Sequence, residues 1–122
     1  LRTYRRDVLA HGYDSTRGWH AMNIAIHAVN VALVYAILRW SFPVEAAFIG
    51  GLAFAFHPMA TASVSSISGR SSDMCAMFYF SVILAVLCGA WVLVPLLLWI
   101  GIKAKEEIVL APVAAFLVWR LG

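Results

Sequence analysis

Charged residues are scarce in this sequence. Only 12% of its 122 residues are Asp, Glu, Lys or Arg, whereas 63% are hydrophobic, and the mean hydropathy is +0.87. A soluble domain carries about twice that share of charge, so the composition excludes an ordinary soluble globule. It also excludes intrinsic disorder, which requires low hydrophobicity. The sequence therefore predicts an integral membrane protein, small enough to be a subunit or a fragment.

Cysteines and nucleic-acid-binding patterns are scarce as well. Cys75 and Cys88 both stand in an apolar run and form no C-x-x-C pair, so we expect two small buried side chains and no disulfide or metal site. The net charge of +3 is modest, and no basic stripe with interleaved aromatic residues indicates nucleic-acid binding. No short apolar region with a cleavage site follows the basic N-terminal residues, as a signal peptide requires.

Long apolar stretches are what the sequence has instead. Residues 19–38 and 74–102 contain no charged residue, and a membrane-crossing helix needs about 20 residues. Residues 1–18 are polar and basic and are expected to lie outside the membrane, which leaves residues 19–122 as one transmembrane domain. This domain is expected to be an all-α polytopic bundle of about five helices, or four if 74–102 is a single helix: 19–40, 43–57, 73–89, 91–103 and 107–120.

Three local patterns refine this picture. Gly50 and Gly51 permit the second helix to pack closely against a neighbour. Residues 61–72 are small and rich in hydroxyl groups, which predicts a loop or a partly buried interfacial helix. Asp73 follows two serines, and we expect it to cap the next helix.

In this five-helix arrangement, most polar groups gather at one membrane face. Seven of the nine Lys and Arg residues fall on the side where the chain begins, here named side X. Arg39 and Arg120 fall on the opposite side, side Y. The positive-inside rule would make side X cytoplasmic. Alternatively, side X holds an anionic headgroup, with Arg70 and Lys105 as its phosphate partners.

Four motifs in these segments resemble those of a known family. Residues 18–30, GWHAMNIAIHAVN, resemble its pattern G-Y-H-x-x-N-x-x-x-H-x-x-N, and residues 57–61, HPMAT, resemble its H-P-x-x-T. Residues 67–72, ISGRSS, resemble its I-S-G-R-S-S, and residues 104–112, AKEEIVLAP, resemble its S-K-E…P. Over residues 18–119 the chain is thus similar to the polytopic transmembrane O-mannosyltransferase-like proteins with tetratricopeptide repeats, in the GT-C glycosyltransferase superfamily.

The resemblance implies a GT-C-like core that takes a sugar from a polyprenyl-phosphate carrier, with no nucleotide or haem cofactor. We expect no metal site. Members transfer the sugar to a protein on the lumenal or periplasmic side. The resemblance thus places side X outside, in a bacterial inner membrane or an endoplasmic reticulum membrane. The candidate residues for the lipid phosphate, all expected on this face, are Arg70, Lys105, His57, Glu106 and His20.

The chain also departs from the family pattern. The family's catalytic acid, in the first external loop, has no counterpart in these residues, and neither do the tetratricopeptide repeats. Ala60 and Ala62 stand where the family often has a polar residue and a glutamate. The stretch between the third and fourth motifs is shorter than usual, so that two helices adjoin without a linker. We therefore expect a core that does not catalyse alone, and no catalytic residue is assigned.

Two other functions remain open. The chain could be a non-catalytic accessory subunit that packs against other transmembrane subunits of a larger complex, such as an energy-transducing or photosynthetic one. It could also bind haem or chlorophyll through His27 and His57, since histidine is a common metal ligand. The ordinary role of polar residues in a membrane helix is to hold helices together, and Asn23, His27 and Asn30 share one helix face. We expect them to form such a helix-packing stripe.

Overall fold

The computed structural model describes residues 16–65, 69–104 and 106–121. Within these ranges the chain forms α-helices and one 3₁₀-helix and contains no strand. The all-helical class expected from the sequence is confirmed. The elements are α2 (Thr16–Ser41), α3 (Val44–Ala55), α4 (Pro58–Ser65), α5 (Arg70–Leu87), α6 (Leu93–Ile102), η1 (Glu106–Leu110) and α7 (Ala111–Leu121).

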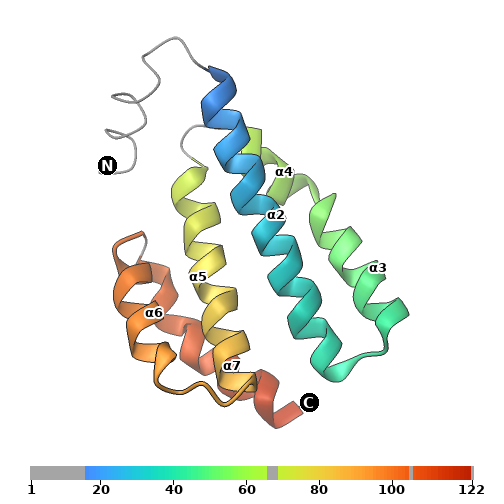
Figure 1. Cartoon of the computed structure of the whole chain (residues 1–122), viewed down its shortest axis with the longest axis vertical. Helices are drawn as coiled ribbons and strands as arrows, with labels where there is room; N and C mark the ends of the chain where they lie inside the picture. The colour runs from blue at the N-terminus through green and yellow to red at the C-terminus, as the bar shows by residue number, and fades with distance from the viewer. Residues whose placement is uncertain (1–15, 66–68, 105, 122) are drawn as a thin grey trace.

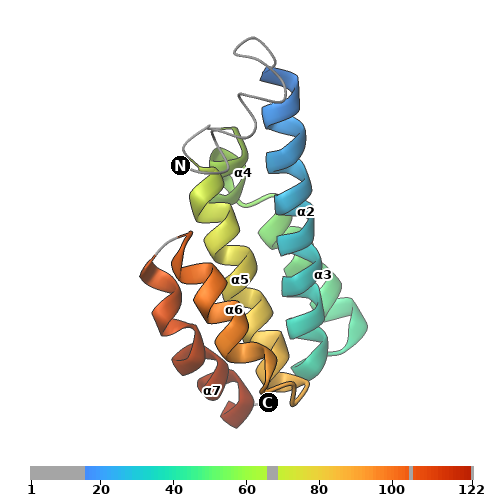
Figure 2. The same cartoon turned by 60° about the vertical axis from the view of Figure 1, so that its left-hand side comes forward.

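Two long helices, α2 and α5, form the centre of the structure and run side by side in the same direction (Figure 1). On one side of this pair, α3 returns antiparallel along α2, and the short α4 leads from its end towards the start of α5. On the other side, α6 and α7 form a hairpin against the second half of α5 (Figure 2). Because α5 contacts both sides, it connects the two halves of the fold.

The apolar core follows α5. Val82 of α5 and Ile108 of η1 are both fully buried and belong to one cluster with Cys75 and Ala111. A second cluster lies further along α5, where Ala115 of α7 packs against three buried side chains: Ile83, Val86 and Leu87. Close packing of these side chains holds the hairpin against α5.

Glycines set two of the closest helix contacts. A Cβ on Gly51 would lie 3.6 Å from Cβ of Tyr35, and one on Gly50 would lie 2.6 Å from Cδ1 of Leu38. The close packing expected at this glycine pair is confirmed, between α3 and α2. At the end of α6, a Cβ on Gly101 would overlap Cδ1 of Ile108 and lie 3.0 Å from Cβ of Phe78.

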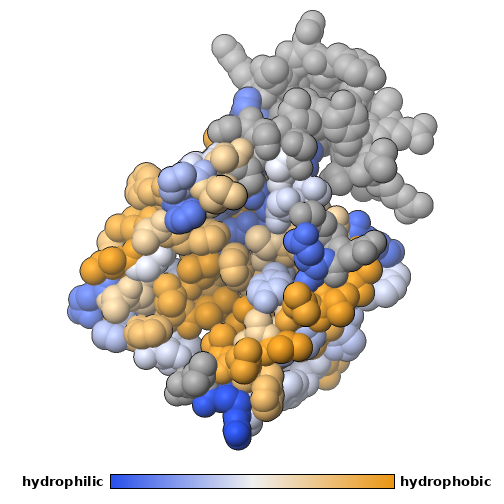
Figure 3. All heavy atoms as spheres, turned by 180° about the vertical axis from the view of Figure 1, so that it is seen from behind, coloured by the Kyte–Doolittle hydropathy of each residue, from blue (hydrophilic) through white to orange (hydrophobic). Residues whose placement is uncertain are grey.

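Among the described residues, two helices are long and apolar enough to cross a membrane: His20–Ser41 and Arg70–Leu87. Helices α3 and α6 are apolar but have only 12 and 10 residues. At 1.5 Å per residue they extend about 18 and 15 Å, less than the roughly 30 Å of a bilayer core. Hydrophobic side chains also cover much of the outer surface (Figure 3). These features support association with a membrane.

The uncharged run 74–102 forms two helices. Helix α5 ends at Leu87, and α6 begins at Leu93. Between them, Gly89 adopts a φ of +72°, a left-handed conformation that favours glycine. The alternative of a single long helix is therefore wrong.

The structure also decides three local expectations: the cap of α5, the burial of the two cysteines and the conformation of the hydroxyl-rich segment. Asp73 is not the cap of α5, because that helix begins earlier, at Arg70, and the carboxylate lies in its first turn. Cys75 is buried, but Cys88 is exposed, since it follows the last residue of α5. The hydroxyl-rich segment is helical as far as Ser65, the end of α4.

Candidate functional site

A buried polar network connects α2 to the first turn of α5. Asn23 and Asn30 are only 2% and 1% exposed. The Nε of Arg70 donates a hydrogen bond to Oδ1 of Asn23 at 3.1 Å. Nδ2 of Asn30 donates to the backbone carbonyl of Asp73 at 3.0 Å. These bonds compensate for the removal of polar groups from water.

His27, between the two asparagines, faces α3. Its Nε2 donates to the carbonyl oxygen of Ala55 at 3.1 Å, and its ring stacks against Phe54 with centroids 5.9 Å apart. The three residues of the polar stripe thus each bond to another helix. In the described part of the chain, no three His, Cys, Asp or Glu side chains cluster as a metal site would require.

Arg70 is largely enclosed, with 7% of its surface exposed, although the sequence suggests an open phosphate ligand. Its bond to Asn23 explains this placement: the guanidinium stem lies in the contact between α2 and α5. Arg70 therefore positions the start of α5 against α2.

A pocket of about 290 Å³ opens beside this network, among α2, α3, α4 and α5. Its lining combines polar groups with apolar side chains. The lining residues are His27, Asn30, Phe54, His57, Met59, Ala60, Ser72, Asp73 and Ala76.

The pocket offers hydrogen-bonding groups of both kinds. Asn30 Oδ1 is buried and accepts no hydrogen bond from the described residues. Nδ1 of His57 accepts a bond from the backbone N–H of Met59 at 3.3 Å, which leaves the neutral ring with a donor at Nε2. Phe54 and Met59 form an apolar part of the pocket wall. This arrangement can hold a small polar group against an apolar surface.

The other candidate residues lie elsewhere or are not described. His20 is exposed and does not line the pocket. Lys105 lies outside the described residues. Glu106 is the first residue of η1, and its side chain is likewise outside the description. Among the phosphate candidates whose side chains the structure describes, only His57 lines the pocket.

Several lining residues were not singled out from the sequence. Ser72 belongs to the ISGRSS motif, so the motif itself was a usable signal. Phe54, Met59 and Ala76 carry no such signal, because an apolar wall residue looks like any other residue of an apolar helix.

No protein-family model, no curated protein and no solved structure matches this chain. These comparisons therefore neither support nor contradict the resemblance found in the motifs.

Proposed function

We propose that the chain is a multi-pass membrane bundle that forms part of the core of a polyprenyl-phosphate-sugar-dependent glycosyltransferase. One observation carries the proposal: three of the four family-like motifs contribute to one pocket. His27 and Asn30 come from the first motif, His57 and Ala60 from the second, and Ser72 from the third. Motifs that are far apart in sequence yet meet at one pocket are typical of a binding site.

The membrane placement is supported by the outer surface. Helices α2, α3, α6 and α7 each carry several large exposed hydrophobic side chains on their described residues, and α4 carries Met59, whereas α5, at the centre of the bundle, carries none. A soluble monomer rarely exposes contiguous apolar patches of more than a few hundred Å². In this proposal α2 and α5 cross the bilayer, and α3, α6 and α7 lie in it beside them.

The chemistry of the pocket fits the sugar of a lipid-linked donor. Sugar hydroxyls donate and accept hydrogen bonds, which suits the hydroxyl of Ser72 and Nε2 of His57, both on exposed residues that line the pocket. Apolar faces of sugars pack against aromatic rings such as Phe54. Arg70, which is enclosed at the start of α5, and Lys105, which lies outside the described residues, stay candidates for the carrier phosphate on the strength of the motifs alone.

A second candidate, a non-catalytic accessory subunit of a membrane complex, is favoured by one observation. Ala60 lines the pocket, and the family often has a polar residue at the matching position. The pocket of this chain is thus less polar than the resemblance implies. A core that has lost activity would keep its fold and pack against other transmembrane subunits.

Sugar transfer separates the two functions. The full-length protein is purified in lipid nanodiscs, and transfer is measured from a polyprenyl-phosphate-linked mannose to protein acceptors. We expect the His57→Ala substitution to slow transfer at least about tenfold. This is the effect of losing a hydrogen bond that contributes about 1.4 kcal/mol to the transition state. The matched control is His20→Ala, which changes an exposed histidine outside the pocket and is expected to leave the rate unchanged. Co-purification with a large complex and no transfer would instead establish the accessory subunit.

A further inference from the structure

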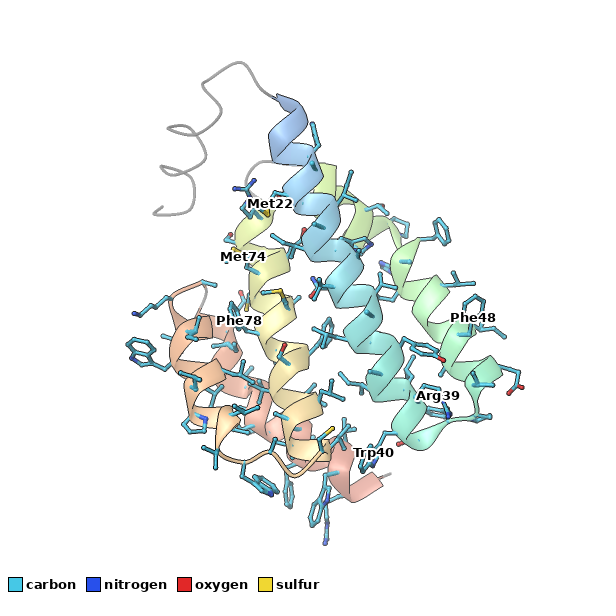
Figure 4. The ribbon with its side chains drawn as sticks, viewed as in Figure 1. Met22, Arg39, Trp40, Phe48, Met74 and Phe78 are labelled. Atoms are coloured by element: carbon cyan, nitrogen blue, oxygen red, sulfur yellow. The ribbon has the colours of Figure 1, made fainter. Side chains whose placement is uncertain are left out.

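The segment between α2 and α5 has to carry the chain back along the bundle. The two long helices run in the same direction (Figure 1), and they are the two described helices that could each span a bilayer alone. Figure 4 shows Met22 of α2 and Met74 of α5 towards one end of the bundle, and Arg39 and Trp40 of α2 at the other. If both helices cross from side X to side Y, residues 42–69 return the chain to side X.

Helix α3 covers only part of this return. The carbonyl of its last residue, Ala55, accepts a hydrogen bond from His27. His27 lies eleven residues after the start of α2 at Thr16, which is about 16 Å along that helix. The short α4 then continues from α3 towards the start of α5 (Figure 1), in contact with both long helices. Together, α3 and α4 make the return.

The sequence of this segment suits a membrane crossing. No charged residue stands between Glu45, in the first turn of α3, and Arg70, at the start of α5. The two helices have 12 and 8 residues, which extend about 30 Å end to end, the thickness of a bilayer core. Between and after them the outer surface is apolar, since Phe56 and Met59 are 76% and 75% exposed.

Pro58 explains why this segment is interrupted. Proline has no backbone N–H, and within a helix its ring clashes with the carbonyl four residues earlier, which here belongs to Phe54. That carbonyl instead accepts the N–H of His57 at 3.2 Å, in a tighter turn that ends α3. A helix can be interrupted at membrane depth where the released backbone groups find partners within the protein.

Side chains supply such partners on both sides of the interruption. At the end of α3, the carbonyl of Ala55 is bonded to Nε2 of His27 at 3.1 Å. The first N–H of α4, that of Met59, donates to Nδ1 of His57 at 3.3 Å. Oγ1 of Thr61 donates to the carbonyl of His57 at 3.3 Å. Of these partners, His27 is the one that comes from a neighbouring helix.

We propose that α3 and α4 are two halves of one membrane crossing, interrupted at His57, and that His27 holds the interruption in place. The interruption borders the pocket, because His57 and Met59 line it. By fixing the end of α3, His27 also fixes where the ring of His57 lies. This inference rests on the membrane placement proposed above, but not on sugar binding.

Cysteine accessibility tests the crossing in the full chain, expressed in a bacterial inner membrane. Ser41→Cys and Ser71→Cys place exposed cysteines near the two ends of the segment, each in a protein that also carries Cys88→Ala. Native Cys88, which is exposed after the end of α5, marks side Y. The Cys88→Ala protein alone, with its buried Cys75, gives the background. A membrane-impermeant maleimide is added to spheroplasts and to inside-out vesicles.

We expect Ser41→Cys and Cys88 to react from one face of the membrane and Ser71→Cys to react severalfold faster from the other. If Ser71→Cys reacts from the same face as Ser41→Cys, the segment does not cross and the inference is wrong. If all three react equally from both faces, the membrane placement itself fails.

Hydrogen exchange tests the role of His27. His27→Phe keeps an aromatic ring against Phe54 but removes the donor, whereas His27→Gln keeps a donor. In lipid nanodiscs, we expect the backbone N–H groups of residues 56–61 to exchange severalfold faster in His27→Phe and at the wild-type rate in His27→Gln. Unchanged exchange in both variants would show that His27 does not hold the interruption. Faster exchange throughout the His27→Phe chain would equally contradict a local role.

Discussion

At the residue scale, buried polar side chains hold the two central helices together. Asn23 and Asn30 are almost fully enclosed and bond to the first turn of α5. An enclosed polar group without a partner costs about 1–3 kcal/mol, so these bonds favour one register of α2 against α5 over others. The sequence pattern singled out Arg70 as a phosphate ligand, because its flanking serines suggested an open anion site. Only the tertiary contact with Asn23 reveals its enclosed position.

Arg70→Ala should therefore weaken folding. The substitution removes the bond to Asn23 and leaves that amide enclosed, so we expect a loss of about 1–3 kcal/mol in the free energy of unfolding. Denaturant titration in detergent micelles, followed by circular dichroism, measures this loss. Arg120→Ala, at an exposed position, should change stability by at most about 0.5 kcal/mol. Equal effects of the two substitutions would contradict a structural role for Arg70.

At the element scale, glycines determine how closely short helices approach long ones. Gly51 lets α3 lie against Tyr35 of α2, and Gly101 lets the hairpin tip close against α5. These two sites differ in the space around them. The neighbour of Gly51 is at ordinary contact distance, whereas Gly101 faces Ile108, which is fully buried and has little room to move.

The two glycines should respond differently to alanine. Gly51→Ala should be neutral or stabilising by up to about 1 kcal/mol, because alanine favours helix and meets only ordinary contacts. Gly101→Ala should instead destabilise by about 1–3 kcal/mol through overpacking against Ile108 and Phe78. Thermal unfolding of both variants under the same conditions compares them. A stabilised Gly101→Ala variant would show that the hairpin tip is loosely packed.

The turn between α5 and α6 allows a separate prediction about Gly89. Gly89 has a positive φ and open space around its Cα, so a side chain there meets backbone strain but no clash. Gly89→Ala should cost about 1 kcal/mol. Gly89→Asn should cost less, since asparagine tolerates this conformation better. Urea titration of both variants checks the order, and equal stabilities would contradict it.

The sequence pattern alone was sufficient to predict some of the helices and their contacts, but not others. The length of the apolar runs indicated α2 and α5, and the glycine pair indicated close packing of α3. The start of α5 was misplaced, because Ser71, Ser72 and Asp73 look like capping residues although the helix begins at Arg70. The sequence singled out polar lining residues such as His27, Asn30 and His57, but the apolar wall comes from residues whose roles depend on how four helices meet.

At the scale of the whole molecule, the helices form a group of long helices and a group of short ones. In the described part of the chain, two helices are long and apolar enough to cross a membrane, and shorter apolar helices lie beside them. The polar network and the pocket both lie in the half of the bundle that contains the start of α5. In our account this half is where a lipid-linked polar group meets protein side chains.

Direct binding of a lipid-linked sugar tests the central claim most closely. Native mass spectrometry of the protein in micelles measures its affinity for polyprenyl-phosphate-mannose and for polyprenyl phosphate alone. We predict tighter binding of the mannosylated lipid, and a loss of about tenfold in that affinity, or about 1.4 kcal/mol, in His57→Ala but not in His20→Ala. Equal affinity for the two lipids, unchanged by His57→Ala, would show that the pocket does not recognise the sugar.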